Sequence, residues 1–268
     1  EKFNEPLDGW DVSSAISLQG MFDGAKAFNQ DLSMWNVSRV RDFRECFRGA
    51  ESFNQNLSTW DMSSAIVAQL MFENAKSFQG IGLEHWNIQR LTSMERMFQG
   101  ASVFNGAIGG WNVSSVTIME SAFRGATLFN QDLDQWQLSP HLHAIRGMFE
   151  GASTFNGKLN GWNLGDTKVR TLERLFSMAS SFNQPLDQWD VVKIEVFSAM
   201  FKGATSFNQN LVSWTTTWAY KFDDMFSEAA SFNGNITTWD MSAAESMPQM
   251  FRGAASFNQP IGSWNFVE

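Results

Sequence analysis

Several residue types are scarce in this 268-residue chain, and each shortage excludes a class of protein. A single cysteine, Cys46, excludes a disulfide framework and a cysteine-ligated zinc site. Lys and Arg number 19 against 28 Asp and Glu, and the net charge of −9 argues against nucleic-acid binding and against a polybasic membrane patch. No apolar run is long enough to span a bilayer.

Phe and Trp, in contrast, are abundant and recur at a fixed spacing. The chain has 25 Phe and 12 Trp against one Tyr. Most steps between repeating Trp residues are 25 residues long, with two of 26 and one of 27. These residues are Trp10, Trp35, Trp60, Trp86, Trp111, Trp136, Trp162, Trp189, Trp214, Trp239 and Trp264. Such a period predicts one solenoid domain over residues 1–268, with about ten to eleven repeats. Because the chain starts inside a repeat, we expect a fragment of a longer protein.

Within one repeat, two periodicities follow each other. Trp111-Asn112-Val113 alternates apolar and polar residues, which is typical of a short strand, and stacked copies would form a parallel sheet. Ser114 is a residue type that caps helix N-termini. Apolar residues then recur at helical spacing, and Gly125 is suited to end the helix. The pattern predicts a short strand and a short helix in every repeat.

Three further repeat positions indicate packing roles. The Trp, Phe and Leu of each repeat are expected to face the core, and Cys46 to be a small buried hydrophobic residue rather than a nucleophile. An Ala after the glycine implies close approach of a neighbouring coil. Asn follows Phe in ten of eleven copies, with Gln79 as the exception, which predicts an amide ladder that satisfies backbone groups in its own and the next coil.

The combined motif is Met-Phe-x-Gly-Ala-x-x-Phe-Asn-Gln-x-Leu-x-x-Trp-Asn/Asp-Val-Ser, matched closely by residues 47–62 and 201–214. It resembles a bacterial surface-protein repeat, known as a mycoplasma domain of unknown function and related to BspA-type leucine-rich repeats. The resemblance implies an α/β solenoid, with a leucine-rich-repeat-like right-handed coil of one parallel strand and one helix per repeat. It also implies cell-surface or extracellular localisation and a role in adhesion or protein contact. The family has no catalytic motif.

Exposed positions are the candidates for function. The residue between Trp and Val should form a polar stripe, which either contacts a partner, a glycan or cations, or caps the following turn. Off-register aromatics in the segment 215–220 suit a binding site, although Trp218 could also pack over a helix start. The candidate contact residues are Asn87, Asn112, Gln137, Asn163, Asp190, Thr215, Trp218 and Tyr220.

Irregular segments add weaker candidates. The segment Gln79-Gly80-Ile81-Gly82 carries the extra residue of its repeat, and insertions in solenoids map to loops. His141 and His143 would need further ligands from elsewhere to bind a metal, so no metal site is expected. Asn56 and Asn235 begin sequons at a variable and therefore exposed position, and are candidate glycosylation sites.

No catalytic triad, phosphate loop or pair of catalytic carboxylates stands out from the repeat, and no cofactor is implied. The sequence favours a non-enzymatic surface or secreted scaffold that binds a protein partner. Two alternatives stay open. The chain could be a structural subunit that packs end to end or within a larger assembly, or a glycan-binding module.

Overall fold

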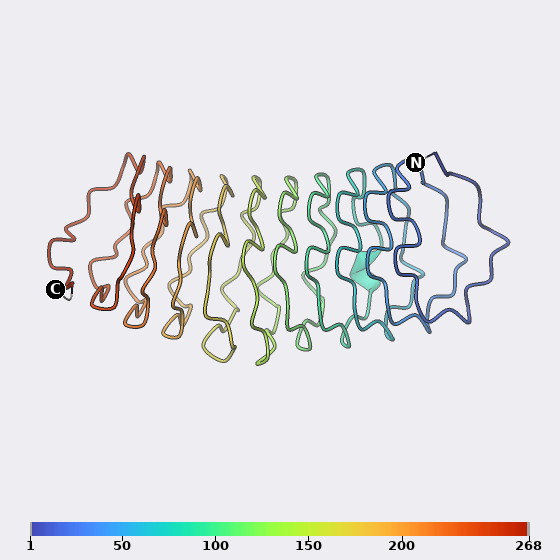
Figure 1. The fold of residues 1–268 in the computed structure, drawn as a ribbon, viewed down its shortest axis with the longest axis horizontal. Helices are drawn as coiled ribbons and strands as arrows, with labels where there is room; N and C mark the ends of the chain where they lie inside the picture. Colours follow the sequence, from blue (N-terminus) through green and yellow to red (C-terminus); the bar gives the residue numbers. More distant parts are fainter. Residues whose placement is uncertain (1, 267–268) are drawn as a thin grey trace.

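The computed structural model describes residues 2–266, and in it the chain winds as a row of stacked coils (Figure 1). Each coil corresponds to one sequence repeat, and the two ends of the chain lie at opposite ends of the row. Because the repeats have nearly equal length, equivalent residues lie in columns that run along the row. Most of the interactions described below join a residue to its equivalent in the next coil.

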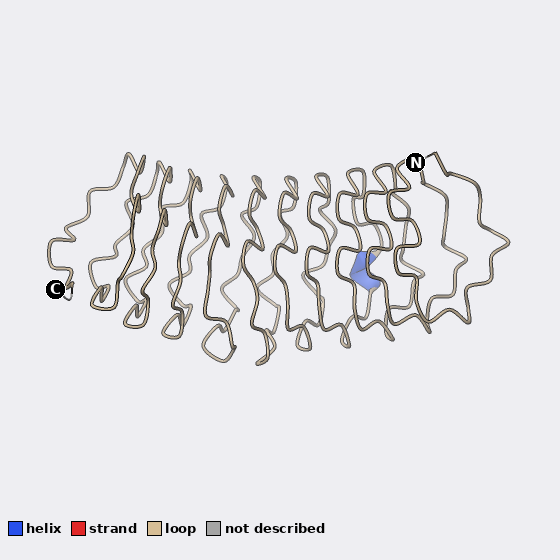
Figure 2. Cartoon of the chain, in the orientation of Figure 1, coloured by secondary structure: helices blue, strands red, loops and turns tan. Residues whose placement is uncertain are grey.

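The predicted α/β architecture, with a strand and a helix per repeat, is wrong. Within residues 2–266 the only helix is η1, a single 3-10 turn at Leu83–His85 (Figure 2). Strands are reduced to isolated parallel bridges between neighbouring coils, such as the bridge from Ile118 to Ala144. These bridges do not lie at Trp-x-Val, where strands were predicted, but nearer the middle of each repeat. The expected leucine-rich-repeat-like coil is therefore not what this chain forms.

Left-handed residues explain why the predicted helix does not form. Ser121 has a φ of 54° and Gly125 a φ of 68°, whereas every residue of an α-helix needs a negative φ. Glycine accepts this conformation readily, so Gly125 was a visible breaker. The other left-handed position, occupied here by Ser121, mostly holds residues other than glycine. It could not be recognised from the sequence. Its members are Gly20, Glu45, Leu70, Arg96, Ser121, Gly147, Arg174, Ala199, Asp224 and Gln249.

Backbone hydrogen bonds in this stretch alternate between two kinds of partner. The amide of Ser121 donates to the Arg146 carbonyl of the next coil at 2.9 Å, and the Gly125 amide donates to Glu150 at 2.7 Å. Between them, the Arg124 amide closes a local turn on the Ser121 carbonyl at 3.1 Å. A helix of about ten residues would be marginal by itself. The alternating pattern gives the buried amides partners and also joins the coils.

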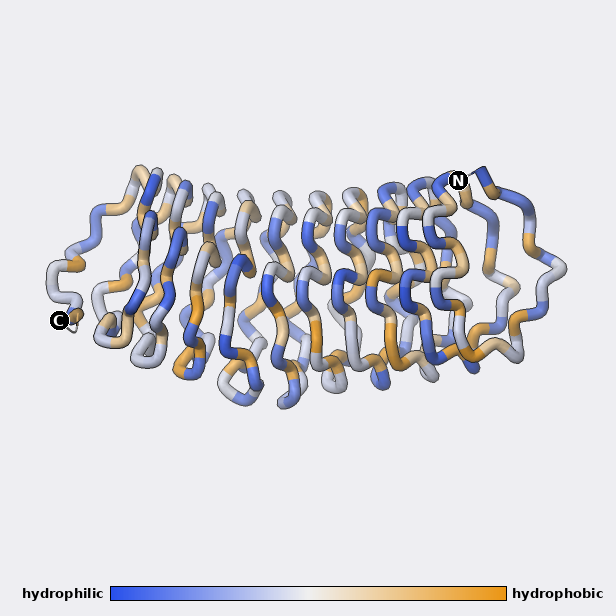
Figure 3. Tube along the Cα trace, viewed as in Figure 1, coloured by the Kyte–Doolittle hydropathy of each residue, from blue (hydrophilic) through white to orange (hydrophobic). Residues whose placement is uncertain are grey.

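The core consists of aromatic columns, and the predicted inward-facing residues are confirmed in the middle coils, whereas Trp10 is 57% exposed. Phe123 stacks between Phe98 and Phe149, with ring centroids 5.6 and 5.7 Å away. The repeat Trp residues are buried from Trp35 to Trp239, and each donates its indole N–H to a carbonyl of the preceding coil. Cys46 is fully buried as predicted, and this burial raises the pKa of its thiol. Figure 3 shows how hydrophobic and hydrophilic stretches alternate along every coil.

The predicted amide ladder is confirmed between neighbouring coils, and it lies at the surface. The Asn130 backbone N–H donates to the Asn105 side-chain Oδ1 at 2.9 Å, and the Asn156 backbone N–H donates to the Asn130 side-chain Oδ1 at 2.8 Å. Each side chain thus accepts a hydrogen bond from the next coil. The ladder changes at Gln79, which takes the place of an Asn. There the Asn105 backbone N–H donates to the backbone carbonyl of Gln79 at 3.2 Å.

A second surface column, just before the glycine, carries charges that pair between coils. Arg48 Nε donates to Asp23 Oδ1 at 2.8 Å, and Arg124 Nη2 lies 3.4 Å from Glu150 Oε1. Glu73 belongs to this column and accepts a hydrogen bond from Gln99 Nε2 at 2.9 Å. Partial burial raises the pKa of Glu73, and it outweighs the opposing effect of the nearby arginines.

Replacing Glu73 by glutamine is expected to raise the melting temperature slightly at pH 7. A carboxyl with a raised folded-state pKa destabilises the native state when it is ionised, and this penalty disappears as pH falls through that pKa. The gain at pH 7 should stay within about 0.5 kcal/mol and should shrink towards pH 4. Thermal melts of both proteins from pH 4 to 8 measure it. A gain that grows as pH falls would contradict this assignment.

Candidate interaction surface

The predicted polar stripe is exposed, and several of its members cap turns. Asn112 Oδ1 accepts hydrogen bonds from the Ser114 amide at 3.1 Å and from the Ser114 hydroxyl at 2.7 Å. Asn87 and Asp190 each accept the amide two residues further on. The predicted helix-capping role of Ser114 is therefore wrong, since its backbone is capped by the preceding Asn.

The remaining stripe candidates behave differently. Asn163 Nδ2 donates to Asp166 Oδ2 at 2.7 Å, within the enlarged loop that follows. Gln137 and Thr215 are exposed. Carboxylates at this position act as turn caps too, because hydrogen bonds from Ser242 lower the pKa of Asp240. Turn capping accounts for part of the stripe, and whether the stripe also binds a partner stays a prediction.

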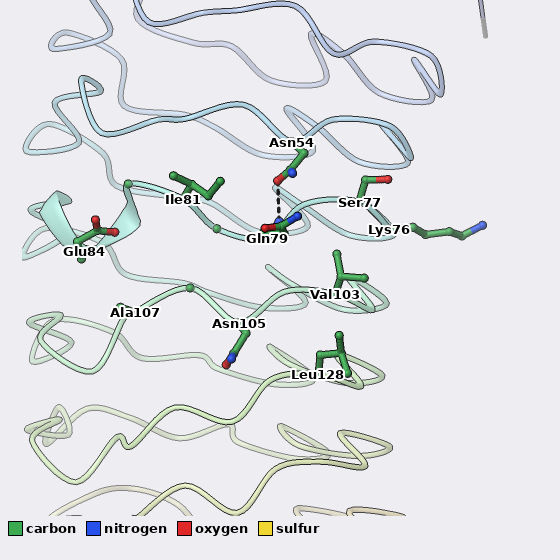
Figure 4. Close-up of a pocket in the computed structure, with 13 residues that line it drawn as sticks. Asn54, Lys76, Ser77, Gln79, Ile81, Glu84, Val103, Asn105, Ala107 and Leu128 are labelled. Atoms are coloured by element: carbon green, nitrogen blue, oxygen red, sulfur yellow. Dashed lines mark hydrogen bonds between the residues drawn. The ribbon is translucent and has the colours of Figure 1, made fainter.

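A groove lies beside Gln79, the residue that takes the place of an Asn in the amide ladder (Figure 4). We call it the Gly80 groove, and its volume is about 810 Å³. Its lining consists of Asn54, Lys76, Ser77, Gln79, Gly80, Ile81, Gly82, Glu84, Val103, Asn105, Gly106, Ala107 and Leu128. Ile81 and Leu128 are 47% and 49% exposed, which is unusual for large apolar residues in this chain. Lys76 and Glu84 lie on opposite sides of the groove.

Glycines shape this groove because the coils approach too closely for side chains. Gly82 has a φ of 89°, and a Cβ added there would lie 2.4 Å from the Ser58 backbone nitrogen. A Cβ on Gly80 would lie 2.5 Å from the Phe104 ring. Larger apolar side chains from neighbouring coils surround Gly80 and Gly82. The sequence showed the irregular Gln79-Gly80-Ile81-Gly82 segment, but not Val103 or Leu128, which come from the next two repeats.

A second hollow contains both predicted aromatic residues. We call it the Trp218 depression. It has a volume of about 410 Å³ and is lined by Arg170, Lys193, Glu195, Trp218 and Tyr220. Trp218 is 67% exposed, so the alternative in which it packs over a helix start is wrong. The three charged residues were missed by the sequence analysis.

The register between coils brings these residues together. The Glu195 amide donates to the Arg170 carbonyl at 2.8 Å, and the Tyr220 amide donates to the Glu195 carbonyl at 3.0 Å. Arg170, Glu195 and Tyr220 are therefore one column on three successive coils. Lys193 Nζ donates to the Gly165 carbonyl at 2.6 Å, which holds the ammonium over the enlarged loop. An alignment of the variable positions in repeats of unequal length would have identified this column from the sequence.

The other candidates are dispersed. His143 Nδ1 lies 3.2 Å from the His141 carbonyl oxygen, and within residues 2–266 no group of three or more His, Cys, Asp or Glu is placed to hold a metal ion. Asn56 is exposed as predicted, but Asn235 is half-buried. Glycosylation of either stays a prediction. Among the described residues, no helix is long and apolar enough to cross a membrane.

The equal coils and their residue columns define a repeat protein. The model of the family described as "Mycoplasma protein of unknown function, DUF285" matches residues 1–81, 71–185 and 170–268, which together span the sequence. The chain belongs to this family, as the repeat motif predicted.

Comparisons with individual proteins add little. No curated protein matches the sequence. A chain in "Crystal structure of TLR13-ssRNA13 complex" is 12% identical with a TM-score of 0.29. That match covers 86% of this chain and 44% of the other, so this chain spans less than half the length of that one. A similarity this low supports no argument about fold or function.

Proposed function

We propose that this chain is a non-enzymatic interaction scaffold, on or outside the cell, that binds a protein partner through the Gly80 groove. The resemblance to bacterial surface-protein repeats supports the location. The observation that carries the proposal is the exposure of Ile81 and Leu128 within one groove, in the middle of a chain whose repeat Trp residues from Trp35 to Trp239 are packed into the core.

The composition of the groove supports a protein partner. Ile81, Val103 and Leu128 provide apolar contact area, while Asn54 and Asn105 provide polar groups beside it. Protein interfaces commonly combine an apolar centre with a polar rim. The groove also rests on coils joined by backbone hydrogen bonds, so little order has to be gained when a partner binds.

Binding of the purified, labelled chain to whole cells of the producing organism tests the proposal. We expect Leu128→Glu to reduce binding by at least about tenfold, since it places a charge in the apolar centre. Val212→Glu is the matched control, because Val212 is also an exposed apolar residue but lies outside the groove. Protease treatment of the cells should abolish binding. Equal binding by the two variants, or binding that survives protease, would refute the assignment.

A further inference from the structure

We propose that the Trp218 depression binds an uncharged sugar residue of a glycan. This site is separate from the Gly80 groove, which lies several coils nearer the N-terminus. The proposal depends on three features of the depression: an exposed aromatic side chain, charged groups of both signs, and a small hollow whose backbone is fixed by hydrogen bonds between coils.

The Trp218 side chain is exposed, unlike the repeat Trp residues of the middle coils. Each repeat Trp from Trp35 to Trp239 is at most 4% exposed and has its indole N–H bonded to a carbonyl, whereas Trp218 is 67% exposed. Trp218 lies outside the repeat position, so the core does not require it. A flat ligand with C–H groups on its face would cover the indole ring and recover its apolar burial. The face of a pyranose ring has this character.

The polar groups of the depression favour a ligand that both donates and accepts hydrogen bonds. Arg170 and Lys193 are donors, Glu195 is an acceptor, and the Tyr220 hydroxyl is both. The separation between Arg170 Nε and Glu195 Oε1 is 3.9 Å, with both side chains nearly half exposed, so they remain accessible to a ligand. Sugar hydroxyls can pair with every one of these groups, and hydrogen bonds to charged partners are the stronger ones.

The lining of the depression carries charges of both signs, which argues against a strongly charged ligand. Arg170 and Lys193 are partly offset by Glu195 within the depression, and the Asp190 carboxylate lies next to Gly165, whose carbonyl binds the Lys193 ammonium. An acidic peptide would meet the Glu195 carboxylate, and a basic peptide would meet two cations. Neither gains the complementary potential that recognition of charged partners uses. A neutral polyhydroxylated ligand has no such conflict.

The size and order of the depression suit a small ligand. Its volume of about 410 Å³ falls in the lower part of the range of small-molecule sites, which is roughly 300–1,000 Å³. Backbone hydrogen bonds fix the relative positions of Arg170, Glu195 and Tyr220 before any ligand arrives. A site held in this way needs little rearrangement to bind.

Calorimetric titration of the chain with neutral glycans tests the proposal. The probes are oligosaccharides of glucose, mannose, galactose and N-acetylglucosamine, with polyglutamate, polylysine and a polyuronate as charged comparisons. We expect at least one neutral oligosaccharide to bind, and Trp218→Ala and Glu195→Gln to weaken that binding by at least about tenfold. Leu128→Glu, which alters the Gly80 groove, should leave the glycan affinity unchanged.

Three results would overturn the proposal. These are no binding of any neutral oligosaccharide, binding that Trp218→Ala leaves intact, or binding through Trp218 of the charged probes alone. The last result would favour a charged peptide or an acidic polysaccharide as the ligand. Because Trp218 is mostly exposed, its alanine variant should keep the wild-type melting temperature. Loss of cell binding in Leu128→Glu reports on the proposed function separately from this site.

Discussion

Replacing Trp111 by alanine is expected to lower the free energy of unfolding by roughly 3–5 kcal/mol. Trp111 is 4% exposed, and its ring centroid lies 6.1 Å from that of Trp86. Its indole N–H donates to the Leu83 carbonyl of the preceding coil at 2.8 Å. The substitution leaves a cavity and removes one of the two hydrogen bonds that this carbonyl accepts, the other coming from the Trp86 backbone amide at 3.1 Å.

Urea denaturation followed by circular dichroism measures this effect, and Trp218→Ala is the matched control. The control removes the same side chain from an exposed site, so its unfolding midpoint should barely change. Because each coil contacts mainly its neighbours, weakening a middle coil should also broaden the transition or split it in two. Equal midpoints for the two alanine variants would show that burial of Trp111 does not stabilise the core.

Replacing Gly82 by alanine is expected to destabilise the chain by roughly 2–4 kcal/mol, a combination of left-handed strain and overpacking. The φ of Gly82 is 89°, and an added Cβ would lie 2.4 Å from Ser58 N and 2.5 Å from Asn56 Oδ1. Ser58 N is backbone and cannot move without shifting its coil. The strain is therefore expected to spread into the floor of the Gly80 groove.

Gly110→Ala provides the control for that substitution. A Cβ at Gly110 would have nothing within 4 Å, and its φ is not in the left-handed region. Thermal melts of the two variants should differ clearly, with Gly110→Ala close to wild type. If Gly82→Ala has the same melting temperature as Gly110→Ala, the close approach of the coils at Ser58 does not constrain position 82.

The repeat itself made some of this structure predictable. Trp111 and Phe123 recur in register, and residues that recur in every copy serve the stacking of coils, so their burial followed from the sequence. The Asn ladder and membership in a repeat family followed in the same way. Trp218 could be selected because it breaks the register, which separates it from the residues that the core needs.

Other features depended on information that one repeat does not contain. The helix prediction failed because Ser121 is left-handed, a conformation that serine rarely adopts by itself and that here accompanies an amide bonded to the next coil. Arg170 and Glu195 join Tyr220 only because successive coils align those positions. The sequence by itself determined the period, the core residues and the ladder, since these repeat along the chain. The tertiary structure alone decided the backbone conformation and the composition of both hollows, because hydrogen bonds and contacts between coils control them.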